Sequence, residues 1–149
     1  VYIMLTLIPV VLIKFKLGNH FLMWFILMTW CVDTFAYIIG GKLHLGKTFI
    51  TKISPKKSYE GLFGGIVMAC ICCYIFASYY LPAHKNILLL ATPILGILEQ
   101  VSDITESYVK RKFDVKDSGT IIPGHGGMLD RFDGFLLSGI AFLIICLVF

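Results

Sequence analysis

Long apolar segments without a charged side chain set the strongest limit on the fold of this chain. No Asp, Glu, Lys or Arg occurs in residues 1–13, 17–32, 61–84, 86–98 or 134–149. A membrane-spanning helix needs about 20 predominantly apolar residues. The chain therefore holds material for four or five crossings and little for a soluble core, because 58% of its 149 residues are hydrophobic and only 15% are charged.

The length of these segments favours helices over a membrane β-barrel. Barrel strands have about ten residues and alternate apolar with polar side chains, whereas these segments are longer and apolar all round. Only helices and closed barrels satisfy every backbone amide in lipid. We therefore expect an all-α, polytopic transmembrane bundle of about five helices, near residues 1–13, 20–40, 61–81, 87–110 and 132–149.

Basic residues gather in two of the connections between these helices. Residues 41–60 hold five and residues 107–131 hold five, whereas the other connections hold only Lys14, Lys16 and Lys85. Two helices separate the two long segments, so both must lie on one side of the membrane. Cytoplasmic loops are enriched in Lys and Arg. We therefore expect an integral membrane protein whose two long loops lie in the cytoplasm.

The chain ends and the cysteines add two expectations. The chain begins at Val1 and ends at Phe149, both in apolar segments, so we expect a fragment of a longer protein. Residues 1–13 lack the basic leader and the small-residue cleavage site of a signal peptide. All five cysteines lie in apolar segments, where thiols act as small hydrophobic side chains, and we expect no metal role for them.

One face of the fourth expected helix carries ionisable side chains. At 100° per residue, Glu99, Asp103, Glu106 and Lys110 fall within a stripe about 60° wide. A charge at the membrane centre costs about 2.5 kcal/mol or more, so such groups usually face a polar cavity or a partner. The alternative is a helix end that reaches the membrane interface, and it stays open for Glu106 and Lys110 in particular.

A glycine-rich segment with two carboxylates precedes the last expected helix. Gly124-His125-Gly126-Gly127 is followed by Asp130-Arg131-Phe132-Asp133, and glycines let a backbone approach a ligand closely. One of these carboxylates is explained by capping of the helix. Two that share a helix face, beside an arginine, fit Mg²⁺ better, because Mg²⁺ is usually held by one or two carboxylates plus substrate phosphates. With Asp103 from another helix, they predict a divalent cation site.

A third group of candidates lies around the first long loop. Asp33 comes about two turns before the cytoplasmic end of an apolar helix, which makes it a functional candidate by default. Ser54-Pro55-Lys56-Lys57 follows in the loop and leads to Glu60-Gly61. Taken alone, this motif indicates no more than a turn with surface charge.

The segment from Ser107 to Asp133 resembles the signature of the phosphatidate cytidylyltransferases, the CDP-diacylglycerol synthases. Upstream, Asp33 with Ala36-Tyr37 and the Ser54-Pro-Lys-Lys motif also resemble this family, and the resemblance covers about residues 25–149. Ser102 is a departure, since glycine is expected there. The signature positions present in this chain are Ser107, Lys110, Arg111, Lys116, Asp117, Gly119, Ile122, Pro123, His125, Gly126, Gly127, Asp130, Arg131 and Asp133.

The resemblance implies transfer of CMP from CTP to phosphatidate, which gives CDP-diacylglycerol and pyrophosphate in phospholipid biosynthesis. It implies Mg²⁺, with a second cation left open, and Asp103, Asp130 and Asp133 as ligands. The expected partners are CTP, phosphatidate and membrane lipids; a homodimer is left open, and no nucleic acid is expected. Family members have further N-terminal helices, so residues 1–149 are expected to be the C-terminal part of the catalytic domain.

The resemblance implies that the two cytoplasmic loops are catalytic and that the membrane is the bacterial inner membrane, and it also assigns roles to single residues. Basic side chains would hold phosphates, His125 with its glycines would shape the nucleotide pocket, and the Ser54–Lys57 loop would close over the substrates. The expected catalytic residues are Asp103, Lys110, Arg111, Lys116, Asp117, His125, Asp130, Arg131 and Asp133. The expected substrate-binding residues are Asp33, Ser54, Lys56, Lys57, Glu60, Ser107, Gly126 and Gly127.

Three other functions stay open at this point. The first is a cytidylyltransferase for another phosphorylated lipid. The second is an ion- or proton-conducting protein in which Asp33, Glu99 and Asp103 form the path. The third is a non-catalytic membrane scaffold. The carboxylate pattern of the CDP-alcohol phosphotransferases is absent from the sequence.

Overall fold

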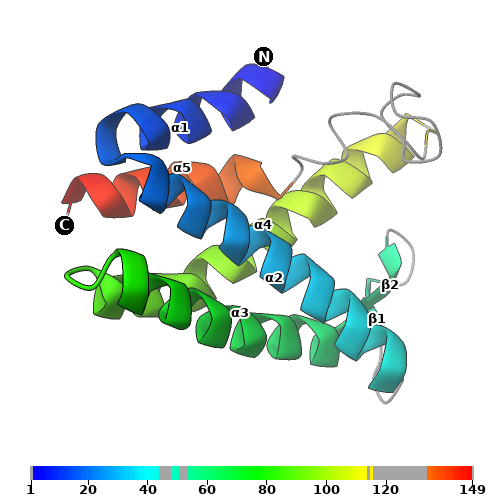
Figure 1. Ribbon diagram of the computed structural model, residues 1–149. Coiled ribbons are helices and arrows are strands. Elements are labelled where there is room, and N and C mark those ends of the chain that lie inside the picture. The colour runs from blue at the N-terminus through cyan, green and yellow to red at the C-terminus, as the bar shows by residue number, and fades with distance from the viewer. Residues whose placement is uncertain (1, 44–47, 51–53, 114, 116–133, 149) are drawn as a thin grey trace, which may run out of the picture.

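Five helices and one β-hairpin make up the described structure, a computed structural model that covers residues 2–43, 48–50, 54–113, 115 and 134–148 (Figure 1). The all-α prediction with five helices is confirmed. The elements in chain order are α1 (Tyr2–Leu17), α2 (Asn19–Leu43), β1 (Thr48–Ile50), β2 (Ser54–Ser58), α3 (Tyr59–Tyr80), α4 (Lys85–Lys112) and α5 (Phe135–Val148).

Local signals in the sequence explain two helix boundaries. Gly18 has a φ of 94°, which glycine adopts without strain, and its amide donates to the Lys14 carbonyl oxygen at 3.1 Å. The chain therefore turns at this single residue, and α1 runs on to Leu17 rather than ending near residue 13. At the start of α3, the Ser58 hydroxyl accepts a hydrogen bond from the Gly61 amide at 3.1 Å. This is the usual arrangement of a serine N-cap.

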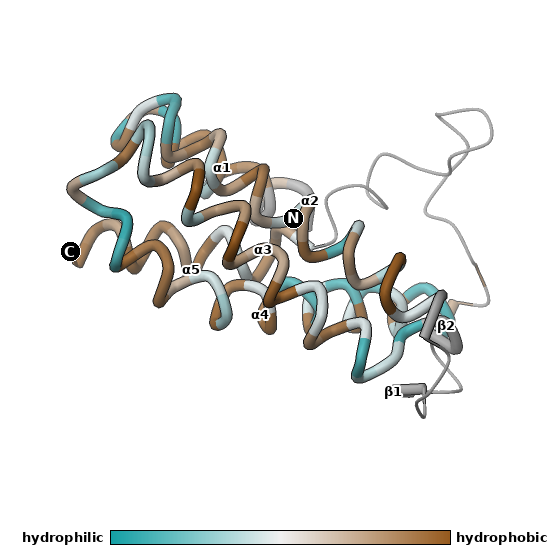
Figure 2. The backbone as a smooth tube through the Cα atoms, turned by 60° about the horizontal axis from the view of Figure 1, so that its bottom comes forward, coloured by the Kyte–Doolittle hydropathy of each residue, from teal (hydrophilic) through white to brown (hydrophobic). Residues whose placement is uncertain are grey.

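Three of the described helices are long and apolar enough to cross a membrane, namely Asn19–Gly41, Tyr59–Tyr80 and Lys85–Lys112. Helices α1 and α5 have 16 and 14 residues, fewer than the roughly 20 that a span needs. The tube coloured by hydropathy shows hydrophobic residues along the helices and hydrophilic ones mostly toward their ends (Figure 2). This pattern fits helices embedded in lipid.

Small residues bring α2 and α3 together along their length (Figure 1). A Cβ atom on Gly65 would lie 2.7 Å from the Val32 carbonyl oxygen, and one on Gly61 would lie 2.6 Å from the Ala36 carbonyl oxygen. The two backbones therefore touch, as in membrane helix pairs with small residues four apart. The buried residues of α3 follow that spacing: Gly61, Gly65, Ala69, Cys73 and Ala77.

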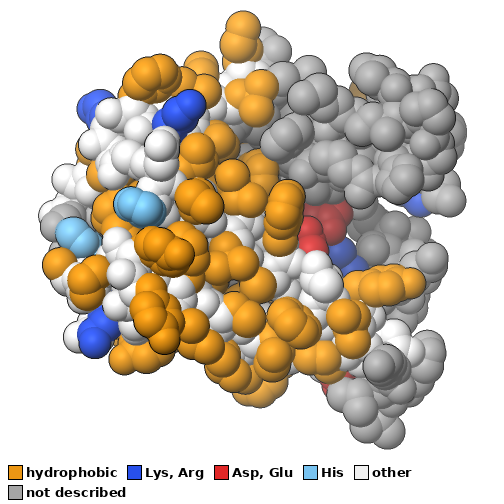
Figure 3. Space-filling view, in the orientation of Figure 1, with side chains coloured by type: hydrophobic (Ala, Val, Ile, Leu, Met, Phe, Trp, Pro, Cys, Tyr) orange, Lys and Arg blue, Asp and Glu red, His pale blue; other side chains and the backbone are white. Residues whose placement is uncertain are grey.

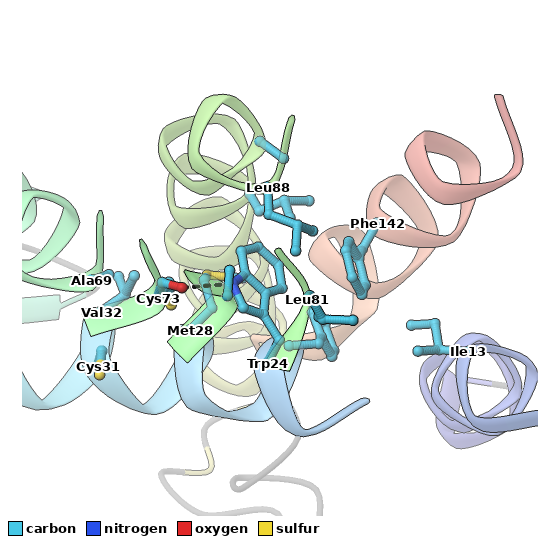
Figure 4. Packing of buried hydrophobic residues seen from close by; sticks show 14 of the residues in the cluster. Ile13, Trp24, Met28, Cys31, Val32, Ala69, Cys73, Leu81, Leu88 and Phe142 are labelled. Carbon is cyan, nitrogen blue, oxygen red and sulfur yellow. Dashed lines mark hydrogen bonds between the residues drawn. The ribbon is translucent and has the colours of Figure 1, made fainter. Parts of the chain in front are cut away.

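Large aromatic side chains fill the core where α2 meets α5. The Phe25 and Phe142 rings stack with their centroids 5.2 Å apart and an interplanar angle of 7°. Trp24 lies 5.1 Å from Phe142, and its indole nitrogen donates to the Cys73 carbonyl oxygen of α3 at 3.2 Å (Figure 4). Cys31 and Cys73 are buried in this cluster as free thiols, which agrees with the prediction that the cysteines act as small hydrophobic side chains.

The hairpin lies at one end of the bundle, and the short connections α1–α2 and α3–α4 lie at the other (Figure 1). Strands β1 and β2 pair antiparallel, so residues predicted as an irregular loop form regular structure. Pro55 does not oppose this, because proline is tolerated in edge strands. At the other end, His20 stacks on Tyr80 with centroids 5.4 Å apart. The short connections thus meet at one end and the hairpin marks the other.

Candidate functional site

A pocket with a volume of about 230 Å³ opens at the hairpin end of the bundle. Helices α2, α3 and α4 and strand β2 all contribute to its wall. Acidic and basic side chains come to the surface there beside an extensive apolar face (Figure 3). The lining residues are Asp33, Ala36, Tyr37, Lys57, Ser58, Gly61, Leu62, Gln100 and Asp103.

An ion pair between Lys57 and Asp103 joins β2 to α4 within this pocket. The two side chains are 21% and 23% exposed, so the pair is partly shielded from solvent. The Ser107 hydroxyl, one turn further along α4, donates to the other carboxylate oxygen of Asp103 at 3.3 Å. Asp103 is therefore held from two sides, by the hairpin and by its own helix.

Asp33 enters the pocket from α2 and is tied to α4. The Gln100 side-chain amide donates to its Oδ1 atom at 3.1 Å. Gln100 itself is buried, and it lies three residues before Asp103, so the two project from neighbouring positions of one helix. This hydrogen bond sets the distance between α2 and α4 at the level of the pocket.

Glu99 lies beneath these residues and is 1% exposed. Its carboxyl group interacts electrostatically with Asp33, Asp103 and Lys57. From donors in the described part of the chain, neither Glu99 oxygen accepts a hydrogen bond. A Cβ atom on Gly134 would lie 2.8 Å from Glu99 Cγ. The side chain therefore packs directly against the residue that precedes α5.

The basic residues at the end of α4 lie about two turns beyond Asp103. The Lys110 ammonium is 3.6 Å from the Glu106 carboxylate, and Glu106 is only 4% exposed. Arg111 donates to the Val115 carbonyl oxygen at 3.4 Å. The four ionisable residues predicted on one face of this helix lie on α4, where Glu99 and Glu106 are buried and Asp103 lines the pocket.

The structure brings four of the expected site residues together. Asp103 contacts Lys57 and Ser107, and Asp33 lines the same pocket. Glu60 lies in the first turn of α3 beside the pocket wall. Ser54 and Lys56 belong to β2, and their side chains lie outside the described part. Eight expected site residues also fall outside the described ranges: Lys116, Asp117, His125, Gly126, Gly127, Asp130, Arg131 and Asp133.

The residues present suit a hard divalent cation as far as they are described. Asp103 offers carboxylate oxygens inside a pocket, and the buried Glu99 oxygens add two more that accept no hydrogen bond from described donors. Oxygen atoms of this kind are the ligands of Mg²⁺, which needs only one or two protein carboxylates when phosphates supply the rest. The described ranges by themselves contain no group of three His, Cys, Asp or Glu residues that could hold a metal ion.

Two contributions to the site were not predicted from the sequence. Gln100 was overlooked, although an amide at the end of an apolar segment and three residues before Asp103 marks a position on the same wall. Ser58 lines the pocket and caps α3, and a serine before Tyr59-Glu60-Gly61 was a recognisable cap signal. Both are uncharged polar residues, whereas the predicted site residues were mainly charged ones.

Comparison with known proteins identifies the family of this chain. The model of the cytidylyltransferase family matches residues 1–149. A phosphatidate cytidylyltransferase of Rickettsia conorii is 41% identical over 143 residues, which cover 88% of this chain and 61% of the relative. A phosphatidate cytidylyltransferase of Bacillus subtilis is 44% identical over 120 residues, which cover 80% of this chain and 44% of the relative.

The chain spans about 61% of the length of the first of these relatives and 44% of the second. The matching region nevertheless includes every described residue of the pocket, because the family model extends over the whole chain. The resemblance seen in the Ser107–Asp133 segment is thereby confirmed. The chain belongs to the cytidylyltransferase family.

Proposed function

We propose that the protein to which this chain belongs transfers CMP from CTP to phosphatidate, and so forms CDP-diacylglycerol and pyrophosphate. One observation carries the proposal: Lys57, from a hairpin segment that resembles a family motif, meets a carboxylate of α4 in a single pocket. Relatives that carry the name phosphatidate cytidylyltransferase support the choice of substrates.

The reaction needs positioning more than it needs a protein nucleophile. A phosphate oxygen of phosphatidate attacks the α-phosphorus of CTP, a new P–O bond forms, and the bond to the β-phosphate oxygen breaks with release of pyrophosphate. Two polyanions must meet in line, and negative charge grows on the leaving group. Lys57, Lys110 and Arg111 are the described cations near the site, and each offers N–H donors to phosphate oxygens.

The family also implies Mg²⁺, and Asp103 is the described residue best placed to hold it. When bound, such a cation would neutralise phosphate charge and orient the reacting groups. Asp130 and Asp133 stay predicted ligands, and a second cation stays open. A pocket of about 230 Å³ is smaller than the roughly 300 to 1,000 Å³ usual for ligand sites. The described walls are therefore one part of a larger site.

The proposal also includes a location in the cell and an orientation of the bundle in the membrane. Lys14 and Lys16 lie in the last turn of α1 and Lys85 begins α4, at the end with few basic residues. The hairpin end carries the lysine-rich loop. By the rule that basic loops stay inside, the hairpin and the end of α4 face the cytoplasm of a bacterial inner membrane. Contacts with membrane lipids and a homodimer stay predictions.

An assay of labelled CTP with the full-length protein in lipid vesicles tests this function. We expect a labelled lipid that depends on added phosphatidate. Competition with a phosphorylated isoprenoid alcohol distinguishes the main rival, because an enzyme for another lipid would prefer that acceptor. An ion-conducting protein would instead show flux through vesicles that depends on Asp103 and not on CTP.

A further inference from the structure

We propose that Lys57 is a built-in counter-ion for Asp103, which a divalent cation must displace before Lys57 can turn to the nucleotide phosphates. This inference rests on the proposed function, because that function implies the divalent cation. Lys57 and Asp103 both lie in the described part of the chain, and their contact is an ion pair.

The contact itself is the first support. Lys57 Nζ pairs with the Asp103 carboxylate across two different elements, β2 and α4. The same ammonium group interacts electrostatically with Asp33 and Glu99. The cation on the hairpin is thus paired with Asp103 and lines the same pocket as Asp33. This is the place that a cation ligated by Asp103 would need.

Charge balance is the second support. Carboxylates that converge in a half-buried pocket repel one another unless a cation lies among them. Lys110 pairs with Glu106, which lies one turn before it on α4. Within the described part of the chain, Lys57 is the basic residue that pairs with Asp103. Without a bound metal ion, this lysine keeps the carboxylates together and the hairpin against α4.

The attachment of Lys57 makes an exchange feasible. The side chain is a single charge on a flexible four-carbon stem, and it extends from a two-stranded sheet. A divalent cation carries twice the charge and prefers carboxylate oxygens. Once it takes Asp103, the ammonium is released within the same pocket. There the phosphates of a bound nucleotide are the next anions within its reach.

Carbodiimide cross-linking measures this exchange directly. The reagent activates a carboxylate, and a neighbouring lysine then closes an amide bond with loss of water, which mass spectrometry detects as a Lys57–Asp103 cross-link in the full-length protein. We expect the yield to fall by about fivefold or more when Mg²⁺ saturates the site, and to stay constant with K⁺ of equal ionic strength. A cross-link that forms equally well with and without Mg²⁺ would overturn the proposal.

Binding of Mn²⁺ alone, measured through the spectrum of the free ion, provides a second readout. Lys57→Gln removes the competing charge, so it should bind Mn²⁺ about threefold to tenfold more tightly than the unchanged protein. Lys57→Arg should stay near the unchanged value, and Lys85→Gln, which removes a lysine at the opposite end, should have no effect. Unchanged or weaker binding by a folded Lys57→Gln protein would contradict the competition.

These measurements separate the inference from the proposed function, because neither uses CTP or lipid. Mg²⁺-sensitive cross-linking in a protein that makes no CDP-diacylglycerol would refute the function and leave the exchange standing. Normal synthesis with Mg²⁺-insensitive cross-linking would refute the exchange alone. Each variant is first checked by gel filtration and thermal unfolding, and a misfolded Lys57→Gln protein leaves the cross-linking test to decide.

Discussion

Lys57 of strand β2 and Asp103 of helix α4 form an ion pair although 46 positions separate them in the sequence. The pair connects two segments that resemble separate motifs of one enzyme family. It is held by three features of the fold: the cap of α3 by Ser58, the tight packing of α2 on α3, and the Ser107 hydrogen bond to Asp103.

The first prediction concerns the carboxylates expected to share one Mg²⁺. Asp103→Asn and Asp130→Asn each remove an anionic ligand, so each should lower kcat/KM by about 100-fold or more. If both serve one cation, the double variant should be little worse than either single variant. Steady-state kinetics with CTP check this. Asp114→Asn, in the spacer between Arg111 and Lys116, is the control, and losses that multiply would argue against a shared cation.

The second prediction concerns the contact between α2 and α3. Gly65→Ala places a methyl group 2.7 Å from the Val32 carbonyl oxygen, so the helices must separate. We expect a loss of about 1 to 3 kcal/mol in the free energy of unfolding, and a lower kcat, because this packing positions the pocket. Gly41→Ala is the matched control, since a Cβ there meets nothing within 4 Å. Equal melting temperatures of the two variants in detergent would contradict the close contact.

The third prediction concerns the two tryptophans. Trp24→Phe removes the hydrogen bond to the Cys73 carbonyl oxygen and some buried surface, which should cost about 1 kcal/mol. Trp24 does not line the pocket, so we expect KM for CTP to stay unchanged. Trp30 is 67% exposed, so Trp30→Phe should leave stability unaltered. Thermal unfolding in the same detergent compares them, and a larger effect at Trp30 would show that the packing is wrong.

The fourth prediction concerns Glu99 and the residue that it touches. Gly134→Ala brings a Cβ to 2.8 Å from Glu99 Cγ, so it should lower the melting temperature. Glu99→Ala frees that space, and the combined variant should be more stable than the sum of the single effects predicts. Gly139→Ala, in the helix that follows Gly134, should be tolerated, because a Cβ there has only ordinary contacts at 3.6 Å. Strictly additive effects would refute the contact.

The sequence predicted the helices well because their signal is local and strong. Charge-free apolar segments of 13 to 24 residues mark the helices, and boundaries moved mainly where Gly18 allowed α1 to continue. The hairpin was not predicted, because a lysine-rich segment with Pro55 lacks the alternating pattern of a buried strand. The spacing of Gly61, Gly65 and Ala69 underlies the α2–α3 contact, but no helix contact was predicted from it.

The site was predicted in part for a related physical reason. Glu99, Asp103 and Glu106 share a helix face, and that face followed from helical geometry alone. Which lysine meets Asp103 depends on how β2 folds back onto α4, and no local pattern encodes that approach. Gln100 illustrates the same limit, since its partner Asp33 lies 67 positions away in the sequence.

Incorporation of label from α-phosphate-labelled CTP into lipid is the most direct test of the whole account. The full-length protein in vesicles, supplied with Mg²⁺ and phosphatidate, should produce labelled CDP-diacylglycerol together with an equal amount of pyrophosphate. The product should be absent without phosphatidate and strongly reduced in the Asp103→Asn variant. A folded, membrane-inserted protein that forms no phosphatidate-dependent labelled lipid would contradict the account.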